Sequence, residues 1–446
     1  MGTMIHKFKF KDILLVLDIN SGAVHVVDEE VFRLLDGLEN SSAKEALVKF
    51  SLDKSTAAKE INQLIAQEML FTDDSYITDK MKNNEDSVVK AICLHVAHDC
   101  NMICTYCFGE QGTFAGSKCL MSLEVGIKAI DYLIANSGFR RNLEIDFFGG
   151  EPLMNFEVVK KLVDYGREQE KLFNKNIRFT ITTNGLLLDD EKTEYINQTM
   201  DNVILSIDGR PEVNDNMRKT VNGSPTYDVI TKNYLDFVDK REGLYYVRGT
   251  FTRNNLDFTK DIEHLVNLGF SNVSVEPVVT DLKQPYALQE TDRDKIFDEY
   301  DRLTDLYMEK MSKGEAFDFF HFNVDLEQGP CIVKRLSGCG AGTEYLAISP
   351  EGDIYPCHQF VGKKDFYIGN LFDSEITNKQ RDKFLNASIY NKEDCRNCWA
   401  KFYCSGGCHA NAINISGDIN KPYKLGCDLE KKRLECAIGI YAKTIE

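Results

Sequence analysis

The chain has 446 residues, 43% of them hydrophobic, which is enough to fill the cores of two to four domains. Its net charge is −17, from 53 basic and 70 acidic residues, which argues against nucleic acid as the main partner. No apolar run approaches the length of a bilayer span, and no signal peptide is visible, so we expect a cytoplasmic protein that binds no membrane.

The cysteines fall into two groups. Of the 14 cysteines, five lie between positions 93 and 119, none follows until Cys331, and nine lie in the last 116 residues. Without a secretion signal, such thiols indicate metal ligands in a reducing compartment rather than disulfides. The sequence therefore predicts two metal regions separated by a cysteine-free middle.

Residues 1–80 are predicted to form a small α/β unit. Strand-like runs at 14–17 and 23–27 are followed by three helical stretches that begin near Asp28, Ser42 and Ser55. A hairpin followed by three helices is a winged-helix-like arrangement, which also suits DNA binding or an accessory packing domain. The acidic run at 28–30 disfavours DNA binding. The polar segment 74–88 is predicted to be a linker.

From residue 88 to 325, strand-like runs alternate with amphipathic helical runs. The predicted strands are 90–97, 142–148, 176–183, 202–207, 244–252 and 271–278. The predicted helices are 122–137, 155–173, 189–200, 225–240, 258–268 and 291–313. Six such pairs predict a parallel sheet with too few strands for a closed eight-stranded barrel. We expect a partial (β/α)6 barrel with ligands at the carboxyl ends of its strands.

Three cysteines follow the first barrel strand at the spacing C-x3-C-x2-C, namely Cys100, Cys104 and Cys107. A 4Fe–4S cube usually takes four cysteines, so three leave one iron open to a small molecule that offers an amine and a carboxylate. A structural zinc ion with a distant fourth ligand is the alternative.

Other cysteines and histidines near the loop are predicted to have no part in the chemistry. Cys93 and Cys119 fall outside the spacing and are expected to be buried free thiols. His95 and His98 are expected to pack and hydrogen-bond beside the loop. Cys436 lies on a terminal helical stretch and is expected to be structural.

Glycine, carboxylate and amide residues follow the second and third strands. Gly149 and Gly150 allow the backbone to approach a ligand closely, and Glu151 can accept hydrogen bonds from an ammonium group. Asn184 follows the third strand and places an amide side chain at the barrel mouth.

The fourth and fifth strands add hydroxyl, carboxylate and guanidinium groups. Ser206 and Asp208 end the fourth strand and can hydrogen-bond a ribose or an amino-acid group. Arg248 is expected to be buried in the fifth strand, where it would need a carboxylate ligand or a structural ion pair with a glutamate. Arg218 is a weaker candidate for the same role.

Residues 326–446 hold a second cysteine array with the central spacing C-x2-C-x5-C-x3-C. The array lacks the two paired ligand sets of a zinc ribbon. The glycines at 406 and 407 permit the close backbone approach that cluster-binding loops need. The array consists of Cys339, Cys357, Cys395, Cys398, Cys404, Cys408 and Cys427.

Together these motifs resemble those of the radical S-adenosylmethionine (SAM) enzymes. The three-cysteine loop, with Tyr106 before its last cysteine, is similar to their signature, and residues 149–152 are similar to the GGEP motif that holds the SAM amino group. The C-terminal array resembles the SPASM extension, and residues 1–80 resemble precursor-peptide recognition elements. The whole chain resembles SPASM-type maturases of SCIFF peptides, the class with six cysteines in forty-five residues.

The resemblance implies SAM and three 4Fe–4S clusters as cofactors, the first cluster on Cys100, Cys104 and Cys107. One auxiliary cluster would take Cys339, Cys357 and Cys408, with a fourth corner that is either Cys331 or open. The other auxiliary cluster would take Cys395, Cys398, Cys404 and Cys427. The implied SAM contacts are Tyr106, Gly149, Gly150, Glu151, Asn184, Ser206, Asp208 and Arg248.

The implied reaction is thioether formation in a Cys-rich precursor peptide, whose leader would add a strand to the sheet of residues 1–80. Reductive cleavage of SAM would yield a 5′-deoxyadenosyl radical, which takes a hydrogen atom from the carbon that then bonds to a Cys sulfur. A ferredoxin or flavodoxin would supply the electron. The alternatives are an oxidase of the anaerobic sulfatase-maturing type and a non-catalytic iron–sulfur or zinc-binding protein.

Overall fold

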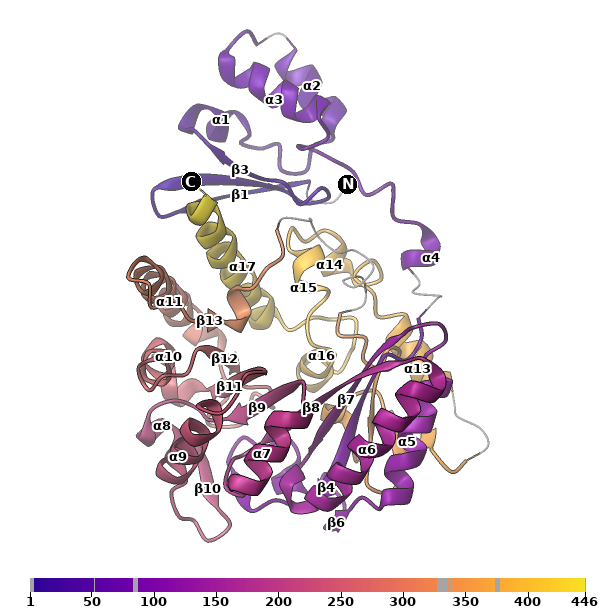
Figure 1. Cartoon of the computed structure of the whole chain (residues 1–446). Coiled ribbons are helices and arrows are strands. Elements are labelled where there is room, and N and C mark those ends of the chain that lie inside the picture. The colour runs from indigo at the N-terminus through magenta and orange to yellow at the C-terminus, as the bar shows by residue number, and fades with distance from the viewer. Residues whose placement is uncertain are drawn as a thin grey trace.

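The computed structural model of the chain describes residues 4–51, 53–82, 87–326, 336, 338–373 and 378–445. A small N-terminal unit stands on one end of a larger α/β body, and the long C-terminal helix α17 (Lys424–Ile445) runs from that body to the unit (Figure 1). None of the described helices combines the length and the apolar composition of a bilayer span.

The N-terminal unit has three antiparallel strands in the order β1 (Ile5–Phe10), β2 (Ile13–Asp18) and β3 (Val24–Val27). β1 was not predicted from the sequence, and in it only Lys7 to Phe10 alternate between lysine and phenylalanine. The helices α1 (Glu29–Leu34), α2 (Ala43–Phe50) and α3 (Thr56–Ala66) have the expected N-caps Asp28, Ser42 and Ser55. The winged-helix-like assignment stays a prediction.

The N-terminal sheet is packed on both faces and is not a detached module. Val16 packs with the three helices, whereas Phe10 belongs to the core of the main body. A Cβ added at Gly439 of α17 would lie 2.2 Å from the Phe10 ring, so the sheet and α17 are in close contact. His6 stacks on Trp399 with ring centroids 3.8 Å apart. The unit therefore shares its packing with the C-terminal region.

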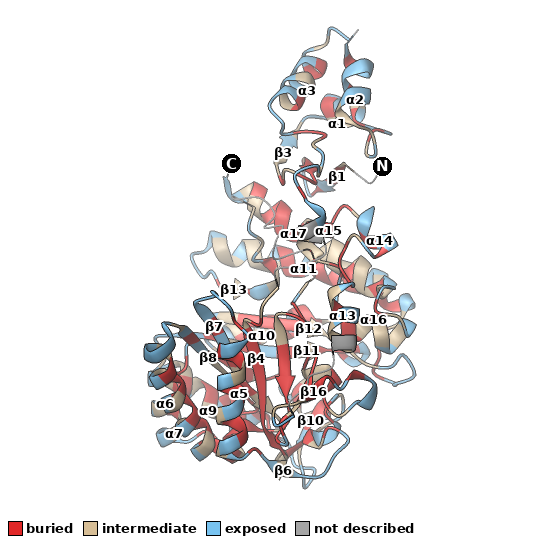
Figure 2. Ribbon diagram, turned by 90° about the vertical axis from the view of Figure 1, so that its right-hand side faces the viewer, coloured by how far each residue is buried: buried red, intermediate tan, exposed pale blue. Residues whose placement is uncertain are grey.

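The barrel contains the six predicted parallel strands in chain order, which confirms the expected partial barrel. They are β4 (Ala91–His98), β7 (Asn142–Gly149), β8 (Asn176–Thr183), β9 (Asn202–Ser206), β11 (Leu244–Phe251) and β12 (Asn272–Pro277). The helices α5 (Leu123–Ala135), α6 (Phe156–Phe173), α7 (Asp190–Thr199), α9 (Tyr227–Val238), α10 (Phe258–Asn267) and α11 (Arg293–Ser312) lie within two residues of prediction. Figure 2 shows the buried strands with helices outside them.

Each edge of the parallel sheet carries a further strand that the sequence did not predict. At one edge β13 (Asp318–Phe319) pairs with β12, and at the other β14 (Tyr345–Ile348) pairs in parallel with β4. β15 (Asp353–Tyr355) and β16 (Gly369–Asn370) continue from β14 in antiparallel fashion. The C-terminal region thus extends the barrel sheet. The division at residues 1–80, 88–325 and 326–446 stays a prediction.

Several short elements complete the part of the chain that the structure describes. β5 (Met102–Cys104) pairs with β10 (Arg218–Thr220), and β6 (Cys119–Leu120) pairs with β4. The remaining helices are α4 (Asp79–Lys82), α8 (Pro211–Met217), α13 (Asn378–Leu385), α14 (Glu393–Arg396), α15 (Lys401–Cys404) and α16 (His409–Ser416). The expected linker is anchored, because Ile77 is buried and Asp74 accepts a hydrogen bond from the Tyr390 hydroxyl at 2.8 Å.

Candidate functional site

The three cysteines of the loop after β4 face one cavity, and the ends of β7, β8 and β9 complete its wall, as expected for a parallel barrel. Within the loop, β5 places Cys104 opposite Arg218. The lining includes Cys100, Cys104, Tyr106, Cys107, Gly149, Gly150, Asn184, Ser206 and Arg218. The structure thus brings together most of the predicted site residues.

The surroundings of Cys100 suit a metal-bound thiolate. Its sulfur accepts hydrogen bonds from the Met102 amide at 3.4 Å and from the Asn184 side-chain amide at 3.6 Å. Burial raises the pKa of Cys100 to about 12 and the pKa of Cys104 to about 11. A bound iron ion would deprotonate both thiols despite their burial. The shared cavity and the N–H donors therefore fit an iron–sulfur cluster.

Gly149 and Gly150 bring the end of β7 against the backbone of the cysteine loop. The Gly150 amide donates to the Ala97 carbonyl at 2.7 Å, and the Glu151 amide donates to the Asp99 carbonyl at 2.9 Å. A Cβ at Gly149 would lie 2.3 Å from the Ala97 oxygen, and one at Gly150 would lie 2.1 Å from the Asp99 oxygen. Packing between chain segments already requires both glycines, whereas the sequence analysis expected room for a ligand.

The Glu151 carboxylate links the ends of two barrel strands, β7 and β8. It is fully buried and accepts hydrogen bonds from the Thr183 hydroxyl and the Asn184 amide, each at 2.8 Å, and from the Leu153 amide at 3.0 Å. These bonds join the end of β7 to the end of β8 and hold Asn184 beside the loop. This differs from the expectation of a carboxylate open to an ammonium group, since Glu151 does not line the cavity.

Tyr106, Asp208 and Arg218 form a hydrogen-bonded cluster beside the cavity. The Tyr106 hydroxyl donates to the Asp208 carboxylate at 2.8 Å and accepts from Nη1 of Arg218 at 3.1 Å. Asp208 also accepts from the Thr250 amide at 3.0 Å. The carboxylate of Asp208 therefore orients the tyrosine and does not line the cavity.

Arg218 is the buried arginine of this site, and the expectation of a buried Arg248 is wrong. The Arg248 side chain is 47% exposed and pairs with Glu276 on β12 at 2.6 Å, which is the structural ion pair considered as the alternative. Nε of Arg218 is buried and has no hydrogen-bond partner among the described residues, which suits an anionic ligand in the cavity. Sequence reasoning ranked Arg218 lower because it lies outside the six-strand pattern.

The C-terminal cysteines gather into two sets that interleave along the chain. The first set is Cys339, Cys357 and Cys408, and in it burial and the two neighbouring thiols raise the pKa of Cys357. The second set is Cys395, Cys398, Cys404 and Cys427. In it burial, the Glu430 carboxylate and the three neighbouring thiols raise the pKa of Cys404. These are the two groups implied by the family resemblance, although ligation itself stays a prediction.

The first set is assembled from three separate loops. Cys339 precedes β14, Cys357 follows β15, and Cys408 precedes α16, while the second set lies on or next to α14, α15 and α17. A cavity of about 580 Å³ is lined by members of both sets and by Glu276. Cys331, the predicted alternative fourth ligand, lies outside the described residues.

A buried lysine lies between the two sets, and sequence reasoning missed it. Nζ of Lys392 donates to the Gly406 carbonyl at 2.9 Å. Burial lowers the pKa of Lys392, whereas the surrounding thiols, including Cys395 and Cys404, raise it. A buried ammonium group fits negatively charged clusters on either side. No local pattern distinguishes this lysine from one on the surface.

Comparison with known proteins assigns both cysteine regions to iron–sulfur domains. Residues 89–230 match the family described as 4Fe-4S single cluster domain, and residues 339–399 match the SPASM iron-sulfur cluster-binding domain. The radical SAM cyclopropyl synthase TigE of Paramaledivibacter caminithermalis is 25% identical over 92% of this chain and 89% of that protein. A cysteine-type anaerobic sulfatase-maturating enzyme of Clostridium perfringens is 26% identical over 69% of this chain and 85% of that protein.

The fold is shared with Streptococcus suis SuiB, whose crystal structure was determined with its precursor peptide SuiA. The TM-score is 0.55 and the identity 17%, over 96% of this chain and all of the SuiB chain. Because 96% leaves few residues outside, the matched stretch includes most of the N-terminal unit. The chain thus contains both iron–sulfur domains and is homologous to radical SAM enzymes that carry a SPASM domain.

Proposed function

We propose that this enzyme forms thioether bonds between Cys sulfur and carbon atoms in a ribosomally synthesised, Cys-rich precursor peptide of the SCIFF class. One observation carries the proposal, namely that the cavity of the three-cysteine loop adjoins the first C-terminal set, which contains Cys357. His358, next to Cys357, has its ring 5.2 Å from Phe148 and 5.5 Å from Phe108, measured between centroids. Both phenylalanines line the loop cavity. A peptide thiol near Cys357 would therefore lie beside the site of hydrogen abstraction.

A row of polar side chains inside the barrel, formed by Ser206, Arg248 and Glu276, supports binding of a peptide between the loop cavity and the C-terminal thiols. Arg248 pairs in register with Ser206, which lines the loop cavity. Its ion-pair partner Glu276 lines the cavity of the C-terminal thiols. Charged and hydroxyl groups along this row would hydrogen-bond a peptide backbone, which needs partners when it leaves water.

The residues present would hold SAM and three 4Fe–4S clusters. The clusters would be bound by Cys100, Cys104 and Cys107, by Cys339, Cys357 and Cys408, and by Cys395, Cys398, Cys404 and Cys427. SAM would be held by the loop-cavity residues Tyr106, Gly149, Gly150, Asn184, Ser206 and Arg218. When bound, and after reduction by a ferredoxin or flavodoxin, the SAM molecule and the first cluster would supply a carbon radical that removes a hydrogen atom. Phe108, Phe148 and His358 would exclude water from that space.

The N-terminal unit would bind the leader peptide by strand addition at β3. Among the described strands β3 pairs only with β2, so one edge of it has no strand partner. The outer edge of β1 is partly occupied, because the amides of Met4 and Ile5 donate to the Glu39 carbonyl at 2.7 and 3.2 Å. Val26 on β3 is 46% exposed and would contact the added strand.

The chemical proposal is tested by counting thiols in the product. The holoenzyme is incubated with SAM, a reductant and a Cys-rich precursor peptide, and the peptide is then alkylated and analysed by mass spectrometry. A thioether removes one S–H and one C–H hydrogen, so we expect a product lighter by two hydrogen atoms with one alkylation site fewer per bond.

Two results would replace the thioether proposal. Loss of two hydrogen atoms with every thiol still alkylated would indicate carbon–carbon ring closure, which the name of TigE describes for that protein. Equal modification of a leaderless peptide would favour the sulfatase-maturing type of oxidase.

The leader site is tested by the substitution Val26→Lys. A lysine on an edge strand opposes strand addition, so leader-peptide affinity should fall by about tenfold. Val48→Lys on α2, where the side chain is 68% exposed, is the matched control and should leave affinity unchanged. Fluorescence anisotropy with a labelled leader measures both. Equal affinities in the two variants would exclude β3 as the docking edge.

A further inference from the structure

Three metal-ligating side chains converge beside the cysteine loop without belonging to either thiol region. They are His98 at the end of β4, Cys119 on β6 and Glu351 in the turn between β14 and β15. Their donor atoms all lie within 4.8 Å of one another. We propose that they bind one divalent transition-metal ion, with Zn²⁺ the best match, whose fourth position faces the adjacent cavity.

Strand pairing places the three ligands together. β6 runs antiparallel to β4 with Cys119 directly opposite His98. β14 also pairs with β4, and the turn that follows it brings Glu351 to the same end of that strand. The Cys119 thiol donates to Oε1 of Glu351 at 3.1 Å, and the Ser349 hydroxyl donates to Oε2 at 2.8 Å. The ligands thus come from three backbone segments fixed by one sheet.

A buried histidine lies behind His98 and fits the same metal site. Nε2 of His98 lies 3.1 Å from Nδ1 of His95, and both rings are buried. This contact lets His98 donate one ring N–H to His95 and present its other nitrogen to a metal, because metal-binding histidines donate their second ring N–H to a neighbouring acceptor. The Phe114 ring packs on both imidazoles, at 4.5 and 4.7 Å between centroids, and holds them in place.

The donor set selects the class of ion. One sulfur, one nitrogen and one oxygen ligand suit Zn²⁺, which takes three protein ligands and a water molecule in open sites. A single thiol does not suit an iron–sulfur cluster. A divalent cation would replace the proton that the Cys119 thiol donates to Glu351, and its charge would balance the resulting thiolate and the carboxylate.

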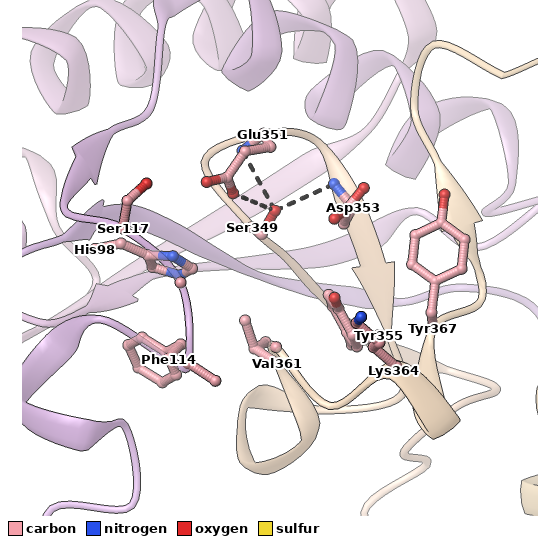
Figure 3. A pocket seen from close by; sticks show the side chains of 13 residues that line it. His98, Phe114, Ser117, Ser349, Glu351, Asp353, Tyr355, Val361, Lys364 and Tyr367 are labelled. Atoms are coloured by element: carbon pink, nitrogen blue, oxygen red, sulfur yellow. Dashed lines mark hydrogen bonds between the residues drawn. The ribbon is translucent and has the colours of Figure 1, made fainter.

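The open position would face a cavity of about 530 Å³, lined by His98 and Glu351 (Figure 3). Ser117, Asp353, Lys364 and Tyr367 surround the rest of this space. Phe114 lines both this cavity and the cavity of the cysteine loop. The ion would therefore tie the C-terminal hairpin to the wall of the radical site and keep a water ligand toward the cavity.

The test is the zinc and iron content of the anaerobically reconstituted full-length protein, together with zinc X-ray absorption. We expect about one zinc per chain after dialysis, with one sulfur neighbour at about 2.3 Å and nitrogen or oxygen neighbours at about 2.0 Å. Cys119→Ala and Glu351→Gln should each weaken zinc binding at least about tenfold, and His95→Ala by about tenfold, with iron unchanged. Cys436→Ala, which removes a buried thiol on α17, is the matched control.

Three results would overturn the proposal. They are wild-type protein that retains no zinc, zinc that persists undiminished in Cys119→Ala, and a zinc shell of four sulfurs. The last would place the metal in the C-terminal array. Because iron content reports folding of the cluster regions, loss of zinc with iron retained cannot be ascribed to an unfolded variant.

Discussion

The loop after β4 and the C-terminal array both collect thiols, but they are built in opposite ways. The loop has its three cysteines between positions 100 and 107, whereas the array draws its cysteines from positions 339 to 427. Because its ligands are close together in the chain, the loop needs neighbouring segments only to fix its position. The backbone of Gly150 and the hydrogen bonds of the Glu151 carboxylate do this. The array exists only when distant segments have already folded together.

Interleaving makes the members of the array depend on one another. Cys404 ends α15 in one set, and Cys408, just before α16, belongs to the other. The short segment between them therefore fixes the distance between the two sets, and the buried Lys392 lies against it through the Gly406 carbonyl. We expect that loss of one loop cysteine abolishes cluster binding in the loop only. Loss of one array cysteine should disturb cluster binding in both sets of the array.

The largest effect is expected from Cys100→Ala, which breaks the loop. Removing one of three ligands should abolish cluster binding, so 5′-deoxyadenosine formation should fall more than about a hundredfold and iron from about twelve to about eight per chain. Liquid chromatography and iron analysis measure both. Cys436→Ala should match the wild type. Continued SAM cleavage in Cys100→Ala would refute the assignment of the loop.

The next largest effect is expected from Cys395→Ala, which breaks the array. Thioether formation should stop while SAM cleavage stays within about threefold of wild type, because the loop is assembled separately. Interleaving predicts a loss of more than about four irons per chain. Loss of only four irons would mean that the two sets assemble independently, and it would contradict the interdependence of the array.

A smaller effect is expected from Glu151→Gln, which weakens the hydrogen bonds between the ends of β7 and β8 and leaves the thiols intact. The amide places an N–H group where the carboxylate accepts from Thr183, Asn184 or Leu153, so one buried bond is lost. We expect a loss of about 1–3 kcal/mol in the free energy of unfolding, measured by denaturant titration.

Glu157→Gln, at an exposed position on α6, is the matched control for this variant. Unchanged stability in Glu151→Gln would show that the strand ends are held without this carboxylate.

Much of this protein was determined by its sequence alone. The six barrel strands follow from apolar periodicity, and the helix starts at Asp28, Ser42 and Ser55 follow from capping, because both signals act within one or two turns of chain. The same is true of the cysteine loop, whose close spacing already implies a shared metal. These features need no knowledge of what packs beside them.

Only the tertiary structure decided which groups are buried and which segments meet. Arg218 is buried because β10 pairs with the cysteine loop, while Arg248 is exposed beside Glu276 on the next strand. β14 joins the barrel edge at β4, and so brings Glu351 to His98 and Cys119. Such pairings join residues that are far apart in the chain and leave no periodic trace in it, so burial, bracing and assembled metal sites become visible only once the chain has folded.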